Sequence, residues 1–207
     1  LIKAGGTGNS SRAASAALTS SLARSFAFAG YNDQDSSGGT SVWAPAIIYN
    51  SSYVWADGST GAYMMYYCTS STYMRSTIGY AVSKSVTGPF EYVDTIVYSG
   101  FTSASSPITT TSSLGTRTVD IWYKNTNIPD LIDKGTLSGT RSGWFTSTGG
   151  FNNTLFPNAI DPALTYDSSG NLWMSYGSWS GGIYILQINK STGQPIYPGS
   201  DSGDTDR

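Results

Sequence analysis

The strings APAIIYN at residues 44–50 and DPALTYD at residues 161–167 decide the fold, because they are two copies of one pattern. They share a proline, the alanine after it and a tyrosine three residues later, at an offset of 117 residues. Both strings combine aliphatic and aromatic residues over the length of a β-strand. We therefore expect two copies of one structural unit, each opening on a strand.

Each copy continues into a second matched segment. Residues 78–82 (IGYAV) match residues 183–187 (IYILQ), and a Thr-Gly turn follows each of them, at Thr87-Gly88 and at Thr192-Gly193. The offset is 105 residues here, and we expect a longer hairpin around residues 51–61 to take up the difference. Repeated units of three or four antiparallel strands are typical of β-propeller blades. An ordinary sandwich of hairpins is the alternative, but it does not predict the matched proline and tyrosine positions.

The rest of the chain reads as short strands separated by turn signals. One helix is expected at residues 13–28, where Leu18, Leu22 and Phe26 have helical spacing. Residues 99–157 are rich in Ser, Thr and Gly and are expected to be irregular. Strands and helices do not alternate, which argues against a doubly wound nucleotide-binding fold. The expected strands are residues 42–49, 62–68, 77–83, 92–98, 159–166, 171–176 and 182–188.

The composition excludes several classes of site. The 207 residues carry 11 Lys and Arg against 13 Asp and Glu, so no basic face for nucleic acid is expected. No apolar run approaches the roughly 20 residues of a membrane span. The chain has no histidine and only one cysteine, Cys68, which excludes a Ser-His-Asp triad, a His-ligated metal and an internal disulfide within it. Glu91 is the only glutamate, so acid–base chemistry depends on few groups.

Four Asn-x-Ser/Thr sequons are spread along the chain, at Asn9, Asn50, Asn152 and Asn189. Such triplets arise by chance in a chain rich in Ser and Thr. Four of them, together with few lysines, favour a secreted, extracellular glycoprotein.

The repeat singles out Asp161. In a propeller the first strand of each blade lines the central channel, and Asp161 opens such a strand. Its match in the other copy is Ala44, so the scaffold does not require a carboxylate at that position. Asp-Pro also initiates ordinary turns, and the repeat alone leaves both interpretations open.

Two longer strings resemble the signature of glycoside hydrolase family 43: NAIDP at residues 158–162 and LWMSYGSWSGGI at residues 172–183. The resemblance is closest to its endo-1,5-α-L-arabinanase and α-L-arabinofuranosidase branch. VWAP at residues 42–45 and IGYAVS at residues 78–83 resemble the preceding blade of the family. The family fold is a five-bladed β-propeller, so the resemblance implies an all-β fold of which this chain supplies about three blades.

The resemblance also implies a reaction, the cleavage of α-L-arabinofuranosidic linkages in arabinan with inversion. Inverting enzymes hold a general acid and a general base about 6.5–9.5 Å apart, which leaves room for a water. The family adds a third carboxylate that orients the acid and tunes its pKa, and Asp161 matches that role. Four further residues match positions close to the sugar: Trp43, Asn158, Ser178 and Trp179. For the two tryptophans, a place in the propeller core is the alternative.

The chain departs from the family pattern at the other two carboxylates. The family's general base lies in an Asp-Pro string of the first blade, but no Asp precedes Asp33 here. Its general acid is a Glu beyond the segment that contains Ile183, where this chain has none, and Glu91 is expected to be a surface charge. The metal near the channel axis uses a His in the family. We therefore expect no cofactor from this chain, although a structural ion such as calcium is compatible with the complete propeller.

Five blades of about 60 residues need about 300 residues, more than the 207 of this chain. We expect a segment of a longer enzyme, with the remaining blades on a companion chain or a further part of the protein. We expect residues 1–30 to form an irregular, partly helical segment, residues 31–199 the blades and residues 200–207 a polar tail. The expected partner is plant cell-wall arabinan, without nucleic acid or membrane. The alternative function is a non-catalytic carbohydrate-binding propeller that has lost its base and acid.

Overall fold

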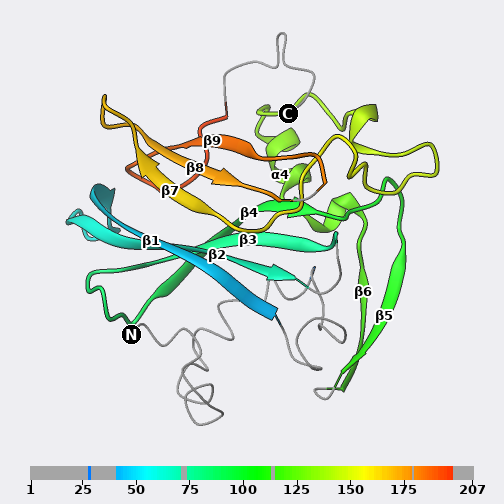
Figure 1. The fold of residues 1–207 in the computed structure, drawn as a ribbon, viewed down its shortest axis with the longest axis horizontal. Helices are drawn as coiled ribbons and strands as arrows, with labels where there is room; N and C mark the ends of the chain where they lie inside the picture. Colours follow the sequence, from blue (N-terminus) through cyan, green and yellow to red (C-terminus); the bar gives the residue numbers. More distant parts are fainter. Residues whose placement is uncertain (1–27, 29–40, 71–73, 113–114, 179, 198–207) are drawn as a thin grey trace.

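The structure is a computed structural model that describes residues 28, 41–70, 74–112, 115–178 and 180–197. Within these ranges it is an all-β protein with three antiparallel sheets (Figure 1). Three short helical segments are η1 (Tyr123–Asn125), α4 (Ile128–Asp133) and η2 (Ser142–Trp144). The strands are β1 (Ser41–Val54), β2 (Thr60–Ser70), β3 (Ser76–Ser83), β4 (Glu91–Ser99), β5 (Pro107–Ser112), β6 (Gly115–Asp120), β7 (Ala163–Tyr166), β8 (Leu172–Tyr176) and β9 (Tyr184–Ile188).

The two larger sheets are meanders, in which each strand pairs with the next along the chain. One has the order β1-β2-β3-β4 and the other the order β7-β8-β9. The two copies of the repeated string fall on β1 and at the start of β7. Their first residues share a left-handed backbone, with φ of 47° at Ala44 and 54° at Asp161. Positive φ is uncommon outside glycine, so its presence at both matched positions supports the alignment of the two copies.

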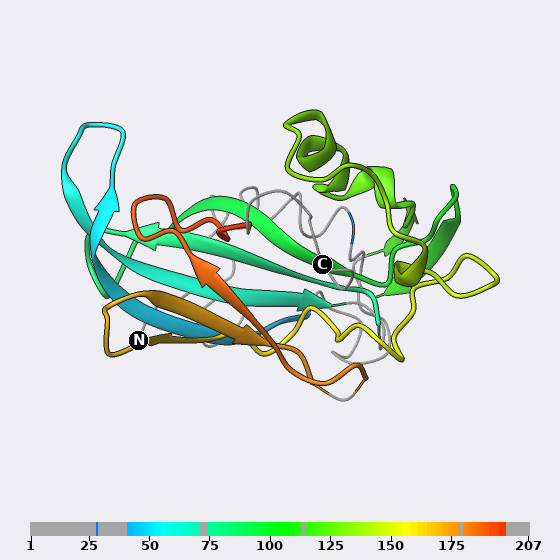
Figure 2. The same cartoon turned by 90° about the horizontal axis from the view of Figure 1, so that it is seen from above.

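The first strands of the two meanders lie side by side (Figure 2). The Tyr166 hydroxyl of β7 donates to the carbonyl of Tyr49 in β1, at 3.2 Å. These two tyrosines occupy the same position in the repeat. The two sheets therefore meet through matched elements rather than through unrelated surfaces.

The main core lies between the two meanders. Successive residues of a strand point to opposite faces, so every second side chain of β2, β3 and β8 enters this core. Burial of this apolar surface is the main force that holds the sheets together. The core residues from these strands are Ala62, Met64, Tyr66, Cys68, Ile78, Tyr80, Val82, Leu172 and Met174.

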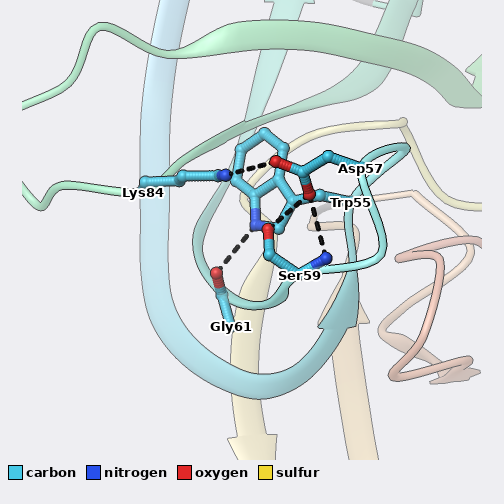
Figure 3. Close-up of polar contacts among 5 residues, drawn as sticks. All are labelled: Trp55, Asp57, Ser59, Gly61 and Lys84. Carbon is cyan, nitrogen blue, oxygen red and sulfur yellow. Dashed lines mark hydrogen bonds and ion pairs between the residues drawn. The ribbon is translucent and has the colours of Figure 1, made fainter.

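A tight turn joins β1 to β2, as the Asp57-Gly58 pair predicts (Figure 3). Asp57 accepts hydrogen bonds from the backbone N–H and the hydroxyl of Ser59. It also forms an ion pair with Lys84 at 2.9 Å. These contacts lower the pKa of the Asp57 carboxyl. The Trp55 indole donates to the carbonyl of Gly61 at 2.8 Å, which closes the turn. This hairpin is longer than the β7–β8 turn, because Tyr49 pairs with Tyr63, 14 residues on, whereas Tyr166 pairs with Leu172, 6 residues on. It therefore accounts for 14 − 6 = 8 residues of the difference of 12 between the two repeat offsets, and not for all of it.

Six of the seven expected strands match the observed ones to within a few residues. The seventh, expected at residues 159–166, begins later, at Ala163, because Asp161 is left-handed and Pro162 has no N–H to donate. Residues 99–157 are not wholly irregular, since β5 and β6 form a hairpin there. Its strands are Thr-rich and lack apolar alternation, so no strand signal stands out. The helix expected at residues 13–28 lies outside the described residues except for Phe28, and the tail at residues 200–207 lies wholly outside them.

Candidate functional site

Asp161 stands at the entrance to β7 on a segment held from two sides. The N–H of Ala159 donates to the Ser99 hydroxyl at 2.9 Å, and the N–H of Gly177 donates to the carbonyl of Ile160 at 2.8 Å. Ala159 and Ile160 are buried in the main core, whereas Asp161 is exposed. A buried, hydrogen-bonded anchor thus presents one exposed carboxylate.

Trp43 lies near the start of β1, and its side chain is 45% exposed. Its indole N–H donates to the Ser70 hydroxyl at 3.1 Å, and its carbonyl accepts the Cys68 thiol at 3.4 Å. The ring is therefore fixed at its polar edge while much of its surface faces solvent. An exposed indole held in this way suits stacking on a sugar ring.

Cys68 connects Trp43 with Asp161. Its thiol donates to the carbonyl of Trp43, and it accepts a hydrogen bond from the backbone N–H of Asp161. Burial, with a smaller contribution from the negative charge of Asp161, raises the pKa of this thiol to about 12. The thiol stays protonated at neutral pH, so it is a structural link and not a nucleophile. The structure thus brings two of the residues singled out by the sequence, Trp43 and Asp161, to the same place.

The other residues expected at the site have different surroundings. Ser178 is half-buried and directly follows Gly177, whose N–H binds the carbonyl of Ile160. A side chain on Gly177 would come within 2.6 Å of Pro157, so this approach requires glycine. Asn158 is 1% exposed, and its Oδ1 has no hydrogen-bond partner among the described residues. Trp179 lies outside the described residues.

Three buried serines at the site were not found from the sequence. Ser70, Ser76 and Ser99 stand opposite one another at the ends of β2, β3 and β4. In a chain rich in serine, no single one of them is conspicuous. Only the pairing register of β2, β3 and β4 places these three serines next to one another, and that register cannot be read from the sequence.

Three of the described carboxylates have clearly structural roles. Asp57, Asp120 and Asp167 each accept hydrogen bonds from their own turn or from a neighbouring loop. These bonds lower all three carboxyl pKa values, which is the opposite of what a general acid requires. Glu91 is exposed at the start of β4, in agreement with a surface charge.

The described part of the chain offers no donor set for a metal ion. Within it, no group of three or more Asp, Glu, Cys or His side chains is placed to hold one. No chemical step is assigned to the calcium considered for the complete propeller.

Comparisons with known proteins point to one group. No protein-family model matches the chain. The chain is 34% identical over 163 residues to an extracellular endo-α-(1→5)-L-arabinanase from Thermotoga petrophila, and these residues are 78% of this chain and 25% of the relative. The crystal structure of an endo-1,5-α-L-arabinanase from the same organism matches 90% of this chain and 30% of its own, with 30% identity and a TM-score of 0.52. A family 43 glycoside hydrolase from Bacillus licheniformis shares the fold, with a TM-score of 0.50 at 23% identity.

The chain spans about a quarter of the length of the Thermotoga petrophila relative. The relative's name describes an extracellular protein, and this agrees with the secreted location predicted from the sequons. Among the described helices, none is long and apolar enough to cross a membrane. The similarity to the two Thermotoga petrophila arabinanases confirms the resemblance noted from the two signature strings.

Proposed function

This chain is a homologue of the arabinanases of glycoside hydrolase family 43 over most of its length, and we propose from this that it forms part of an enzyme that cleaves α-L-arabinofuranosidic linkages in arabinan. The proposed architecture is a five-bladed propeller in which the two meanders are neighbouring blades. The match of β1 with β7, and their contact, support this arrangement.

One observation carries the proposal for the site. Asp161 is an exposed carboxylate at a left-handed position, and the matched residue of the other meander is Ala44. The backbone conformation is therefore common to both copies, whereas the carboxylate belongs to one of them. A left-handed backbone at a non-glycine residue is costly and clusters at functional sites. A charge added to one copy of a repeated scaffold is best explained by function.

The proposed role of Asp161 follows from inverting chemistry. A general acid protonates the leaving oxygen while a general base activates water on the opposite face of the sugar. A nearby carboxylate disfavours ionisation of the acid and so keeps it protonated near neutral pH. Asp161 fills this third role, while the acid and base come from residues outside this chain, on a further segment or a companion chain.

Trp43 supplies the proposed binding surface for the uncharged sugar. Its indole ring is partly exposed and held by Ser70, and the Cys68 thiol contacts both the Trp43 carbonyl and the Asp161 backbone. Asn158, Ser178 and Trp179 remain proposed contacts. Of these, Ser178 has direct support from its place beside the segment that carries Asp161.

The experiment has two arms. The 207-residue chain is titrated with α-1,5-linked arabinopentaose by calorimetry, and the full protein that contains it is incubated with debranched arabinan while reducing sugar is measured. We expect binding without turnover by the chain and turnover by the full protein. Asp161→Asn should lower kcat of the full protein at least ~10²-fold, the usual contribution of acid–base machinery. Binding by the full protein without turnover would show a carbohydrate-binding propeller instead.

A further inference from the structure

Three buried hydroxyls run in a row across the ends of β2, β3 and β4. Ser70 stands opposite Ser76, and Ser76 stands opposite Ser99. Their exposed fractions are 2%, 1% and 1%. Buried hydroxyls that form no hydrogen bonds are costly, so the partners of this row show what it holds in place.

One end of the row holds Trp43. The Ser70 hydroxyl accepts the indole N–H at 3.1 Å and shares a hydrogen bond of 2.8 Å with the Ser76 hydroxyl. Ser76 therefore fixes the direction in which the Ser70 oxygen presents its lone pair. The orientation of the exposed indole ring depends on this pair.

The other end holds the segment that leads to Asp161. The Ser99 hydroxyl donates to the carbonyl of Met74 at 2.7 Å and accepts the N–H of Ala159 at 2.9 Å. Ala159 stands two residues before Asp161. The bond from the Ala159 N–H is formed between the two meanders, so Ser99 joins the first sheet to the strand entrance of the second.

We infer that Ser70, Ser76 and Ser99 are positioning residues that set the Trp43 indole and the Asp161 carboxylate relative to each other for sugar binding. The inference rests on the proposed function and adds to it the residues that align its two recognition groups. None of the three serines needs to touch the sugar. A shift of a recognition group by about 1 Å costs far more in function than in stability, which is why a buried row is suited to this task.

The chain contains a matched control. Thr69 and Thr77 stand opposite each other one position along the same strands and share a hydrogen bond of 2.6 Å. Both are fully buried, but their side chains point to the opposite face of the sheet from Ser70 and do not take part in the row. Thr69→Val therefore removes one buried hydroxyl bond from the same strand pair without releasing Trp43.

The experiment compares Ser70→Ala, Ser99→Ala and Thr69→Val in the 207-residue chain. Hydrogen exchange by NMR reports on the Trp43 indole N–H, assigned through Trp43→Phe, and on the Ala159 amide. Calorimetry with arabinopentaose gives the affinity, and urea unfolding gives the stability of each variant. Ser76→Ala serves as a milder variant should Ser70→Ala fail to fold, because it leaves the Ser70 oxygen in place but undirected.

We expect Ser70→Ala to speed hydrogen exchange of the Trp43 indole N–H about 10-fold relative to Thr69→Val. Ser99→Ala should speed exchange of the Ala159 amide by a similar factor relative to the same control. Both serine variants should weaken arabinopentaose binding about 3- to 10-fold, while Thr69→Val changes it less than about 2-fold. Equal exchange and equal affinity in all three variants would overturn the inference. If the unmodified chain binds no arabinopentaose and the full protein releases no reducing sugar from arabinan, the proposed function fails, but the exchange rates still decide whether the serines hold Trp43 and Ala159.

Discussion

The Cys68 thiol contacts two backbone groups of the candidate site. It donates to the carbonyl of Trp43 and accepts from the backbone N–H of Asp161. Burial raises its pKa to about 12, so nearly all of it is protonated at pH 8. We predict that a thiol-specific disulfide reagent labels the native chain at least ~100-fold more slowly than the urea-unfolded chain. Because the chain has a single cysteine, absorbance of the released chromophore measures this residue alone. Complete labelling of the native chain at the unfolded rate would contradict the buried position.

Two of the sequons have opposite surroundings, and this predicts which asparagine can carry a glycan. Asn50 is 1% exposed, and its Nδ2 donates to the carbonyl of Lys190 at 2.6 Å. Asn189 is exposed in a turn, where its Oδ1 accepts the N–H and hydroxyl of Ser191. We expect the chain secreted from a eukaryotic host to be occupied at Asn189 and bare at Asn50, since a glycan at Asn50 has no room between the sheets.

Peptide mass spectrometry after enzymatic deglycosylation in heavy-oxygen water reads both positions in one sample. Ser191→Ala is the control, because it removes the Asn189 sequon and leaves Asn50 unchanged. Occupancy at Asn50 in secreted, folded protein would show that this side chain is not buried as described.

At the scale of the element, the β7–β8 turn makes stability depend on pH. Asp167 accepts hydrogen bonds from the backbone of Ser169, from the backbone and side chain of Asn171 and from the indole of Trp173. These bonds lower the Asp167 pKa to about 2 from an ordinary value of 3.8. A lowered folded-state pKa contributes stability that is present above the ordinary pKa and is lost as the pH falls through the folded value.

We predict that Asp167→Asn lowers stability at pH 6 and that its deficit shrinks between about pH 4 and pH 2. Urea midpoints of the chain and of the variant over this range measure the effect. At the matched position of the other copy, Asn50 Oδ1 accepts the N–H of Ser52 as Asp167 accepts that of Ser169, so asparagine can keep this contact without the charge. A deficit that stays constant down to pH 2 would show that the charged form of Asp167 has no role in the turn.

The strands also show which features of the fold and the site could be predicted from the sequence alone. The two copies of the repeat predicted β1 and β7 and their equivalence, because proline and tyrosine at fixed spacing are visible in the letters. The same comparison singled out Asp161, since a carboxylate stands where the other copy has alanine. The serine row stayed hidden, because it depends on which residues of three strands stand opposite one another. Strand register is set by packing across the whole sheet and is not a local property of the sequence.

At the scale of the whole molecule, two groups of apolar side chains are exposed among the described residues. Ile47 and Tyr49 on β1 are 40% and 53% exposed, and Ile183 just before β9 and Ile185 within it are 72% and 65% exposed. Apolar side chains along strands at the margins of sheets are typical of surfaces that another segment covers. The short span of this chain relative to the Thermotoga petrophila relative agrees with this, because the relative has further chain to supply such segments.

We therefore predict that the 207-residue chain self-associates at micromolar concentration and that the Ile183→Lys/Ile185→Lys double variant associates at least ~10-fold more weakly. Sedimentation velocity over a concentration series measures both. Thr109→Lys/Thr118→Lys is the matched control, since it adds the same charge to the exposed β5–β6 hairpin, away from these faces. A general effect of charge would weaken association equally in both double variants, whereas an effect of the uncovered face appears only at Ile183 and Ile185. A wild-type chain that stays monomeric throughout the series would mean that these faces need no cover, and the proposal of missing blades would lose its physical basis.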